Sequence, residues 1–177
     1  MMLKEKLIAA FTRLGFDEYR EILPKDIIFS QYVFDQCARN TCGMFGKNHG
    51  CPPKAGTEEE RKNRVLKYNS AFVISKIISI RTRQEMNDSQ MILARITKEL
   101  RDEFARDEVL IMGAGPCLVC EKCTALTDEP CRFPEKTQYS MEGSGIDVVT
   151  MSKELNMTYQ CRKWQSRILR LGALSSI

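Results

Sequence analysis

The residues of this chain with the most distinctive chemistry are its cysteines, and the densest group is Cys117, Cys120, Cys123 and Cys131. The first three are separated by two residues each, so one loop can present three thiolates to a compact centre. A four-iron cubane needs four soft thiolate ligands, and a C-x2-C-x2-C run supplies three of them in bacterial ferredoxins. Cys131, which follows after seven residues, can provide the fourth. The spacing therefore favours a [4Fe-4S]-type iron–sulfur cluster.

A second group consists of Cys37, Cys42 and Cys51 in a loop rich in glycine and proline. Three ligands leave a fourth position, for which the candidates are His49, Cys161, a cysteine of the other loop, or water or substrate at an open site. An open position would indicate chemistry beyond electron transfer. The ordinary reading of His49 is a surface loop residue, and that of the isolated Cys161 is a small buried hydrophobic residue.

Zinc is the main alternative metal, because C-x2-C is also a zinc-binding spacing and tetrahedral zinc accepts four cysteines. A zinc knuckle usually contributes two ligands, so a third cysteine at the same interval favours a cluster. The remaining possibility is that the clustered cysteines bind no metal and are free thiols. Positively charged residues flank the cysteines and would lower thiolate pKa values, although each taken singly reads as an ordinary surface residue. They are Lys47, Lys54, Lys122, Arg132 and Lys136.

Composition excludes several classes of protein. At 177 residues the chain is long enough to bury a hydrophobic core without stabilisation by disulfide bonds, so a metal is expected to serve function and not only folding. The net charge of +4 comes from 27 basic and 23 acidic residues spread along the chain, so no nucleic-acid partner is expected. One local basic run is interpreted as a solvated face. It contains Arg162, Lys163, Arg167 and Arg170.

The sequence predicts no membrane segment, because no stretch approaches the roughly 20 uninterrupted apolar residues that a spanning helix needs. Lys4, Lys6 and Arg13 interrupt the N-terminal apolar residues, which follow helical spacing and predict a surface helix instead of a signal peptide. A cytoplasmic location is therefore expected. In that reducing compartment, clustered cysteines indicate metal or redox chemistry and not disulfides.

Helix boundaries are marked by local signals. The N-terminal helix should end near Gly15, a typical C-terminal cap. Thr57 and Glu60 form a capping box, which predicts a helix over residues 58–68. Asp147 is a good cap for a helix that begins at Val148. A longer helix is predicted from an apolar stripe of Leu93, Ile96, Leu100 and Phe104.

The strands predicted from apolar runs are residues 71–80 and 109–112, whereas residues 27–34 fit either a strand or a short buried helix. The second strand leads directly into the second cysteine loop, which should therefore lie at a sheet edge. Alternating strands and helices predict an α/β or α+β fold. We expect one layered domain over residues 1–177, with a mixed sheet flanked by helices and cysteine loops at 35–56 and 113–136.

Four segments together resemble the cysteine-rich predicted metal-binding proteins known as domain of unknown function 2284. They are CGMFGKNHGCPP at 42–53, GPCLVCEKC at 115–123, PCRFPE at 130–135 and SMEGSGIDV at 140–148. The resemblance extends from about residue 30 to about residue 158, and the family is common in anaerobic bacteria and archaea. It implies a shared metal-binding set of seven residues, without implying a substrate. The set is Cys37, Cys42, Cys51, Cys117, Cys120, Cys123 and Cys131.

Three functional hypotheses follow. The leading one is an iron–sulfur protein that passes electrons to a redox protein partner, or activates a small molecule at an incompletely ligated iron. The second is a zinc-stabilised binding module, and the third is a thiol-based metal sensor or carrier without redox activity. A dinucleotide site at Gly113-x-Gly115 is disfavoured, because the third glycine is missing and cysteines follow where a helix should begin.

Overall fold

The structure, a computed structural model, describes residues 2–105, 107–158 and 167–175 and is built on a five-stranded sheet. The strands lie in the order β1-β2-β5-β3-β4. All neighbouring pairs are antiparallel except β3 and β4, which are parallel. Their bounds are β1 Glu18–Ile22, β2 Ser70–Ile78, β3 Val109–Gly113, β4 Tyr139–Ser140 and β5 Arg167–Ser175. The mixed sheet and flanking helices confirm the predicted fold class.

One face of the sheet is covered by α1 (Leu3–Arg13) and α4 (Arg83–Glu103). Successive side chains of a strand point to opposite faces, so Phe72 and Ile74 of β2 pack on this side. The buried residues here are Leu7, Ala10, Phe11, Phe72, Ile74, Leu100, Phe104, Val109 and Ile111. The predicted stripe therefore places α4 against the sheet, although Phe104 is one residue beyond the end of the helix.

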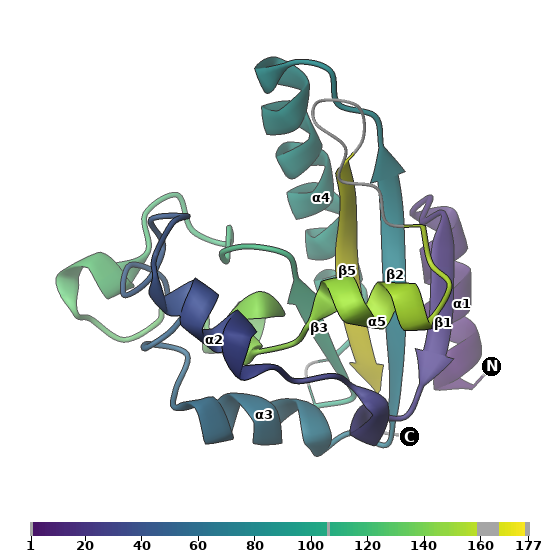
Figure 1. Cartoon of the computed structure of the whole chain (residues 1–177), viewed down its shortest axis with the longest axis horizontal. Helices are drawn as coiled ribbons and strands as arrows, with labels where there is room; N and C mark the ends of the chain where they lie inside the picture. The colour runs from purple at the N-terminus through teal and green to yellow at the C-terminus, as the bar shows by residue number, and fades with distance from the viewer. Residues whose placement is uncertain (1, 106, 159–166, 176–177) are drawn as a thin grey trace.

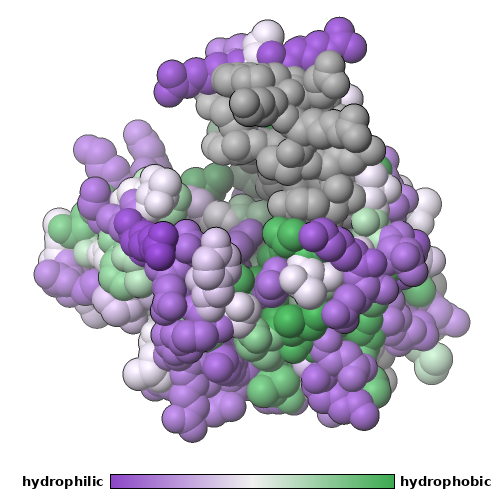
Figure 2. Space-filling model, viewed as in Figure 1, coloured by the Kyte–Doolittle hydropathy of each residue, from purple (hydrophilic) through white to green (hydrophobic). Residues whose placement is uncertain are grey.

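The other face carries α3 (Glu58–Leu66) and α5 (Val148–Glu154), with the short helix η1 (Pro24–Asp26). Its buried residues are Ile27, Val65, Tyr68, Ala71, Val73, Leu110, Met112, Met141, Ile146, Met151 and Met157. In Figure 1, α5 crosses in front of the strands and α3 lies below them. Figure 2 shows this face with apolar residues gathered at its centre and polar residues around them.

The predicted helix starts are confirmed by their hydrogen bonds. Thr57 Oγ1 accepts from Glu60 N at 3.2 Å, and the Glu60 carboxylate accepts from Thr57 N at 2.7 Å. Asp147 Oδ1 accepts from Thr150 N at 2.9 Å, which fixes the start of α5. Gly15 follows α1 with a φ of 74°, as the prediction of a C-terminal cap requires.

The cysteine segments form a lobe beside the β4 edge of the sheet, on the left in Figure 1. One part consists of α2 (Gln31–Ala38) and the loop 39–57. The other part is the connection 114–138 between β3 and β4, which contains η2 (Thr124–Thr127) and η3 (Pro134–Lys136). The prediction that the second cysteine loop lies at a sheet edge is therefore confirmed. The turn η4 (Glu142–Ser144) follows β4 directly.

Two features differ from the expectations. Residues 27–34 form neither a strand nor one short helix: Phe29 makes a single bridge to Ile146, and α2 begins at Gln31. As a result Cys37 lies on the last turn of α2 and not in a loop. The C-terminal segment, which gave no clear pattern, supplies the central strand β5. Cys161, Arg162 and Lys163 lie outside the described residues.

Within the described ranges, no helix combines the length and the apolar character needed to cross a bilayer.

Candidate metal centre

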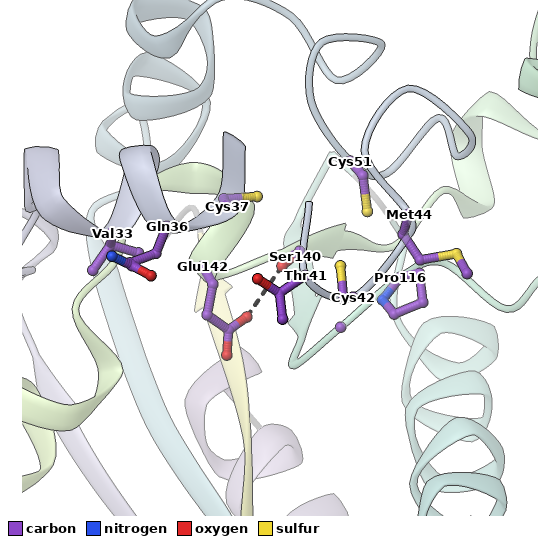
Figure 3. Close-up of a pocket in the computed structure, with 11 residues that line it drawn as sticks. Val33, Gln36, Cys37, Thr41, Cys42, Met44, Cys51, Pro116, Ser140 and Glu142 are labelled. Carbon is purple, nitrogen blue, oxygen red and sulfur yellow. Dashed lines mark hydrogen bonds between the residues drawn. The ribbon is translucent and has the colours of Figure 1, made fainter. Parts of the chain in front are cut away.

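Cys37, Cys42 and Cys51 line one cavity of about 550 Å³. Cys37 comes from the end of α2, and the other two come from the loop that follows. Figure 3 shows the three sulfur atoms directed toward a common space, with Ser140 and Glu142 on another part of the wall. The three thiols predicted as one group are therefore brought together by the fold.

Cys37, Cys42 and Cys51 are called the first set below. The surroundings of Cys37 and Cys51 favour protonated thiols in the absence of a cation. Burial raises the pKa of Cys51 to about 12, and negative charge at Cys37, Cys42, Cys117 and Glu142 acts in the same direction. Burial and then the neighbouring Cys42 raise the pKa of Cys37. A bound cation would remove this penalty, because it stabilises the thiolate form.

Glu142 adds a carboxyl group to the wall of the same cavity. Burial raises its pKa, against the effect of hydrogen bonds from its own backbone N–H, from Ser140 Oγ at 3.1 Å and from the Gly115 backbone N–H. Glu142 was not singled out in the sequence, although it stands in the segment 140–148 that carries part of the family resemblance, outside both cysteine loops. Only the turn after β4 brings it to the cavity.

The cysteines of the connection between β3 and β4 are called the second set. They are Cys117, Cys120, Cys123 and Cys131, all half-buried. Burial raises the pKa of Cys120, the positive charge of Arg132 opposes this, and the other three cysteines act as negative neighbours that raise it further. The other three predicted ligands thus lie within electrostatic range of Cys120. Of the five flanking cations singled out in the sequence, Arg132 is the one that acts on the pKa of Cys120.

Two sulfur atoms of the second set already have polar neighbours. Gln138 N lies 3.4 Å from Cys117 Sγ and donates to it, and Thr137 Oγ1 lies 3.3 Å from Cys131 Sγ. Hydrogen bonds to the sulfur ligands stabilise their negative charge and shift the potential of a redox centre. The segment that leads into β4 therefore supports both ends of the second set.

The two cysteine loops meet at Asn48, a residue that is only 6 % exposed. Its Oδ1 accepts from Gly50 N at 2.8 Å and from Cys117 N at 3.3 Å, and its Nδ2 donates to Cys117 O at 2.9 Å. One amide side chain thus joins the backbone of the first loop at Gly50, next to Cys51, to the backbone of the second loop at Cys117. Cys117 is consequently a neighbour of both sets, since its charge also acts on Cys51 and Cys120. Asn48 was missed because an asparagine in a glycine-rich loop ordinarily indicates a turn.

His49 and Lys54 add contacts between the same loops. His49 Nε2 lies 3.0 Å from the Glu129 carbonyl oxygen, to which it donates, and 3.3 Å from Thr124 Oγ1. Lys54 Nζ forms an ion pair with Asp128. His49 therefore contacts the second loop in this structure, and its position explains why a histidine stands in an otherwise cysteine-based motif.

Gly50 permits the close approach of the two loops. A Cβ atom at this position would lie 2.0 Å from the Gln138 carbonyl oxygen and 3.1 Å from Cys117 Cβ. The Gly50 carbonyl also accepts from Ser140 N at 3.2 Å. No other residue can occupy this position without separating the loops.

Gly50→Ala is therefore expected to lower the free energy of unfolding by about 1–3 kcal/mol, the usual cost of overpacking a tight site, and to reduce bound metal. Gly46→Ala is the comparison variant: Gly46 lies in the same loop with open space around its added Cβ, so alanine there meets only the strain of a φ of 74° and should leave the loop junction and its metal in place. Denaturant unfolding and metal analysis would measure both effects. Equal losses of metal in the two variants would contradict the role given to the loop junction.

Two arginines of α3, Arg61 and Arg64, carry buried guanidinium groups, and the charge of Arg61 acts on Cys37 of the first set. The Arg61 guanidinium stacks 5.0 Å from the Phe34 ring centroid, and the Arg64 guanidinium lies 3.8 Å from that of Tyr139. Arg61 is 5 % exposed, and its Nε and Nη1, like Arg64 Nη1, are buried without a hydrogen-bond partner among the described residues. Burial lowers the pKa of Arg61, whereas the charge of Glu58 and then that of a Cys37 thiolate oppose this effect. A buried cation is costly unless negative charge compensates it.

The donor set suits a thiophilic metal group. Seven cysteines are described, none in a disulfide, and soft thiolates select zinc, copper(I) or iron–sulfur clusters. Across the described part of the chain, no three His, Cys, Asp or Glu side chains are gathered closely enough to hold a single ion as they stand. The thiols are thus grouped around shared space and are not closed around one point.

Metal affinity should depend on pH. Because raised pKa values keep Cys37 and Cys51 protonated near neutrality, metal binding must displace their protons, and affinity should rise about tenfold per pH unit for each proton displaced. Titration of metal-free protein with Co²⁺ between about pH 6.5 and 8.5, followed by thiolate-to-cobalt absorption, should give a slope of about two or more. A slope near zero would contradict the protonation states described here.

The fold is mixed α/β, and the lobe at one edge of its sheet contains a cysteine-lined cavity. The family model of predicted metal-binding proteins, domain of unknown function 2284, matches residues 20–174, so the chain belongs to this family. The match confirms the resemblance and extends it at both ends. Comparison with curated proteins finds no match, and comparison with solved structures finds none either.

Proposed function

We propose that this protein carries an iron–sulfur cluster of the [4Fe-4S] type and exchanges electrons with a partner protein. The observation that carries the proposal is the convergence of two cysteine loops in one lobe, with Cys117 held at their junction by Asn48. The second set supplies the four thiolates that a cubane requires, three of them from one loop. When bound, such a cluster supplies reversible one-electron transfer.

The charges around the lobe support a negatively charged centre. Four thiolates give a metal centre a net negative charge, which nearby cations offset. The charge of Arg132 acts on Cys120 of the second set, and the buried charge of Arg61 acts on Cys37 of the first set. Each group of thiols therefore has a cation beside it that favours the thiolate form.

The first set supports a second role for the same lobe. Its three thiols line a cavity of about 550 Å³ together with the carboxyl group of Glu142. Three protein ligands and an adjacent cavity are the arrangement in which a metal centre keeps a position for water or substrate. Glu142, whose pKa is raised by burial, is placed to hold a proton beside that position.

Anaerobic purification tests the proposal. We expect a brown protein that contains iron and acid-labile sulfide in near-equal amounts, and a paramagnetic resonance signal after reduction. A colourless protein with zinc and no sulfide would overturn the proposal in favour of a zinc-stabilised module. Rapid exchange of the metal with external thiols would instead indicate a sensor or carrier.

A further inference from the structure

A groove of about 410 Å³ lies between α4 and the second cysteine loop. On the α4 side its wall extends from Met91 to Asp102, and on the loop side it includes Leu118, Val119 and Phe133. Leu118 and Val119 are the two residues between Cys117 and Cys120. Whatever occupies the groove therefore contacts the chain between two predicted ligands.

Large apolar side chains are unusually exposed around this groove. Met91 is 69 % exposed, Leu118 is 54 % exposed and Phe133 is 42 % exposed. They come from α4 and from two separate parts of the cysteine loop, so they form one patch only in the folded protein. Clustered exposed apolar residues of this kind mark contact sites.

The groove is also positively charged. The described residues that line it include the cations Arg95, Lys98, Arg101 and Lys136, against Asp102 as the single carboxylate. Asp102 pairs with Lys98 at 2.5 Å, an exposed contact that contributes little stability. The apolar patch is thus bordered by positive charge that suits an anionic partner.

The length of the groove favours a protein segment over a small molecule. From Met91 to Asp102 the α4 face covers eleven residue steps, which at about 1.5 Å per residue is roughly 16 Å. An extended peptide of about five residues has this length. Acidic side chains on such a segment would meet the cations while its apolar side chains cover Leu118 and Phe133.

The groove is connected to the cysteines by hydrogen bonds. Arg101 Nη1 donates to Gln138 Oε1 at 2.5 Å, and the Gln138 backbone N–H donates to Cys117 Sγ at 3.4 Å. Gln138 Nε2 also donates to Pro116 O at 3.4 Å. A partner in the groove therefore lies next to the contacts that position Cys117.

We infer that this groove is the docking surface for a small acidic electron-carrier protein, which exchanges electrons with the centre across Leu118 and Val119. The inference rests on the proposed function and adds where the partner binds and what charge it bears. One electron passes between the two proteins, so the carrier is oxidised as the centre is reduced, or the reverse. Electrostatic attraction should make the encounter fast and dependent on salt.

The test uses the metal-loaded full chain and a reduced acidic ferredoxin as the probe. The second-order rate of electron transfer should fall steeply as ionic strength rises. In the double variant Arg95→Glu, Lys98→Glu, the rate at low salt should fall at least tenfold while the potential of the centre is unchanged. The matched control is Lys25→Glu, Lys153→Glu, which makes the same charge change at exposed positions on the opposite side of the sheet.

Carbodiimide cross-linking of the same probe to the purified chain provides a measurement that does not require the centre. Cross-links at Lys98 or Lys136, lost at high salt, would support the docking surface even if no iron is found. A loaded protein with salt-independent rates, equal rates in both double variants and no cross-link at these lysines would overturn the inference. Absence of iron alone would overturn the proposed function instead.

Discussion

Replacing Cys117 with serine is expected to remove most of the bound metal, a larger loss than replacement of any other single cysteine should cause. Cys117 is the cysteine whose charge acts on both Cys51 and Cys120, and its backbone is bonded on both sides to Asn48. Serine is a hard oxygen donor and a poor substitute for a soft thiolate. Iron and sulfide analysis, with the visible spectrum, would measure the loss.

Cys161→Ser is the matched control, because it makes the same chemical change at a cysteine outside both sets. This variant should retain its metal. Denaturant unfolding of the metal-free Cys117→Ser protein would separate a lost ligand from a lost fold, since serine should leave the metal-free chain nearly as stable. Normal metal content in Cys117→Ser would show that Cys117 is not a required ligand and would contradict the four-thiolate centre.

Arg61→Met should lower the reduction potential of a centre held by Cys37 by tens of millivolts, because the buried Arg61 charge acts on Cys37. At an effective dielectric constant near 20, two neighbouring unit charges interact by a few kcal/mol at most, and 1.4 kcal/mol corresponds to about 59 mV for one electron. Removal of a buried positive charge disfavours the more negative, reduced state, so the potential falls. Redox titration followed by paramagnetic resonance would measure the shift.

The same substitution should not destabilise the metal-free protein, because methionine replaces a buried guanidinium whose Nε and Nη1 have no partner among the described residues. Arg39→Met is the control: Arg39 lies two residues after Cys37 but is exposed, so solvent screens its charge. Arg61→Lys should recover part of the potential, since it keeps the charge. Equal shifts in the Arg39 and Arg61 variants would refute a specific role for the buried cation.

The sequence predicted those parts of the fold that depend on neighbours along the chain. The capping box of α3, the apolar runs of β2 and β3 and the stripe on α4 all involve residues within a few positions of one another. Strand β5 was not recognised although it occupies the centre of the sheet, between β2 and β3. Its apolar residues are mixed with Arg167, Arg170 and Gly172, so its identity as a strand depends on pairing with two partners far away in the sequence.

The candidate site likewise has features that the sequence indicated and features that appear only in the folded protein. The cysteine spacing alone indicated two ligand groups, but it gave no reason to choose Asn48, Glu142 or Arg61. Asn48 acts on a residue 69 positions away, and Glu142 reaches the cavity through the turn after β4. Arg61 reads as a solvated residue of an acidic and basic helix until α3 packs beside Cys37.

The sequence by itself determined the chemistry of this protein: soft thiolates at intervals that suit a metal centre, on loops that glycine and proline keep out of helices and strands. The tertiary structure alone decided that both loops share one lobe, which buried charges face it, and that a basic, apolar groove lies alongside. The physical reason is the distance along the chain over which each property depends on other residues. Ligand type and spacing are local properties of the chain, whereas burial and long-range electrostatics exist only after the sheet has placed distant segments together.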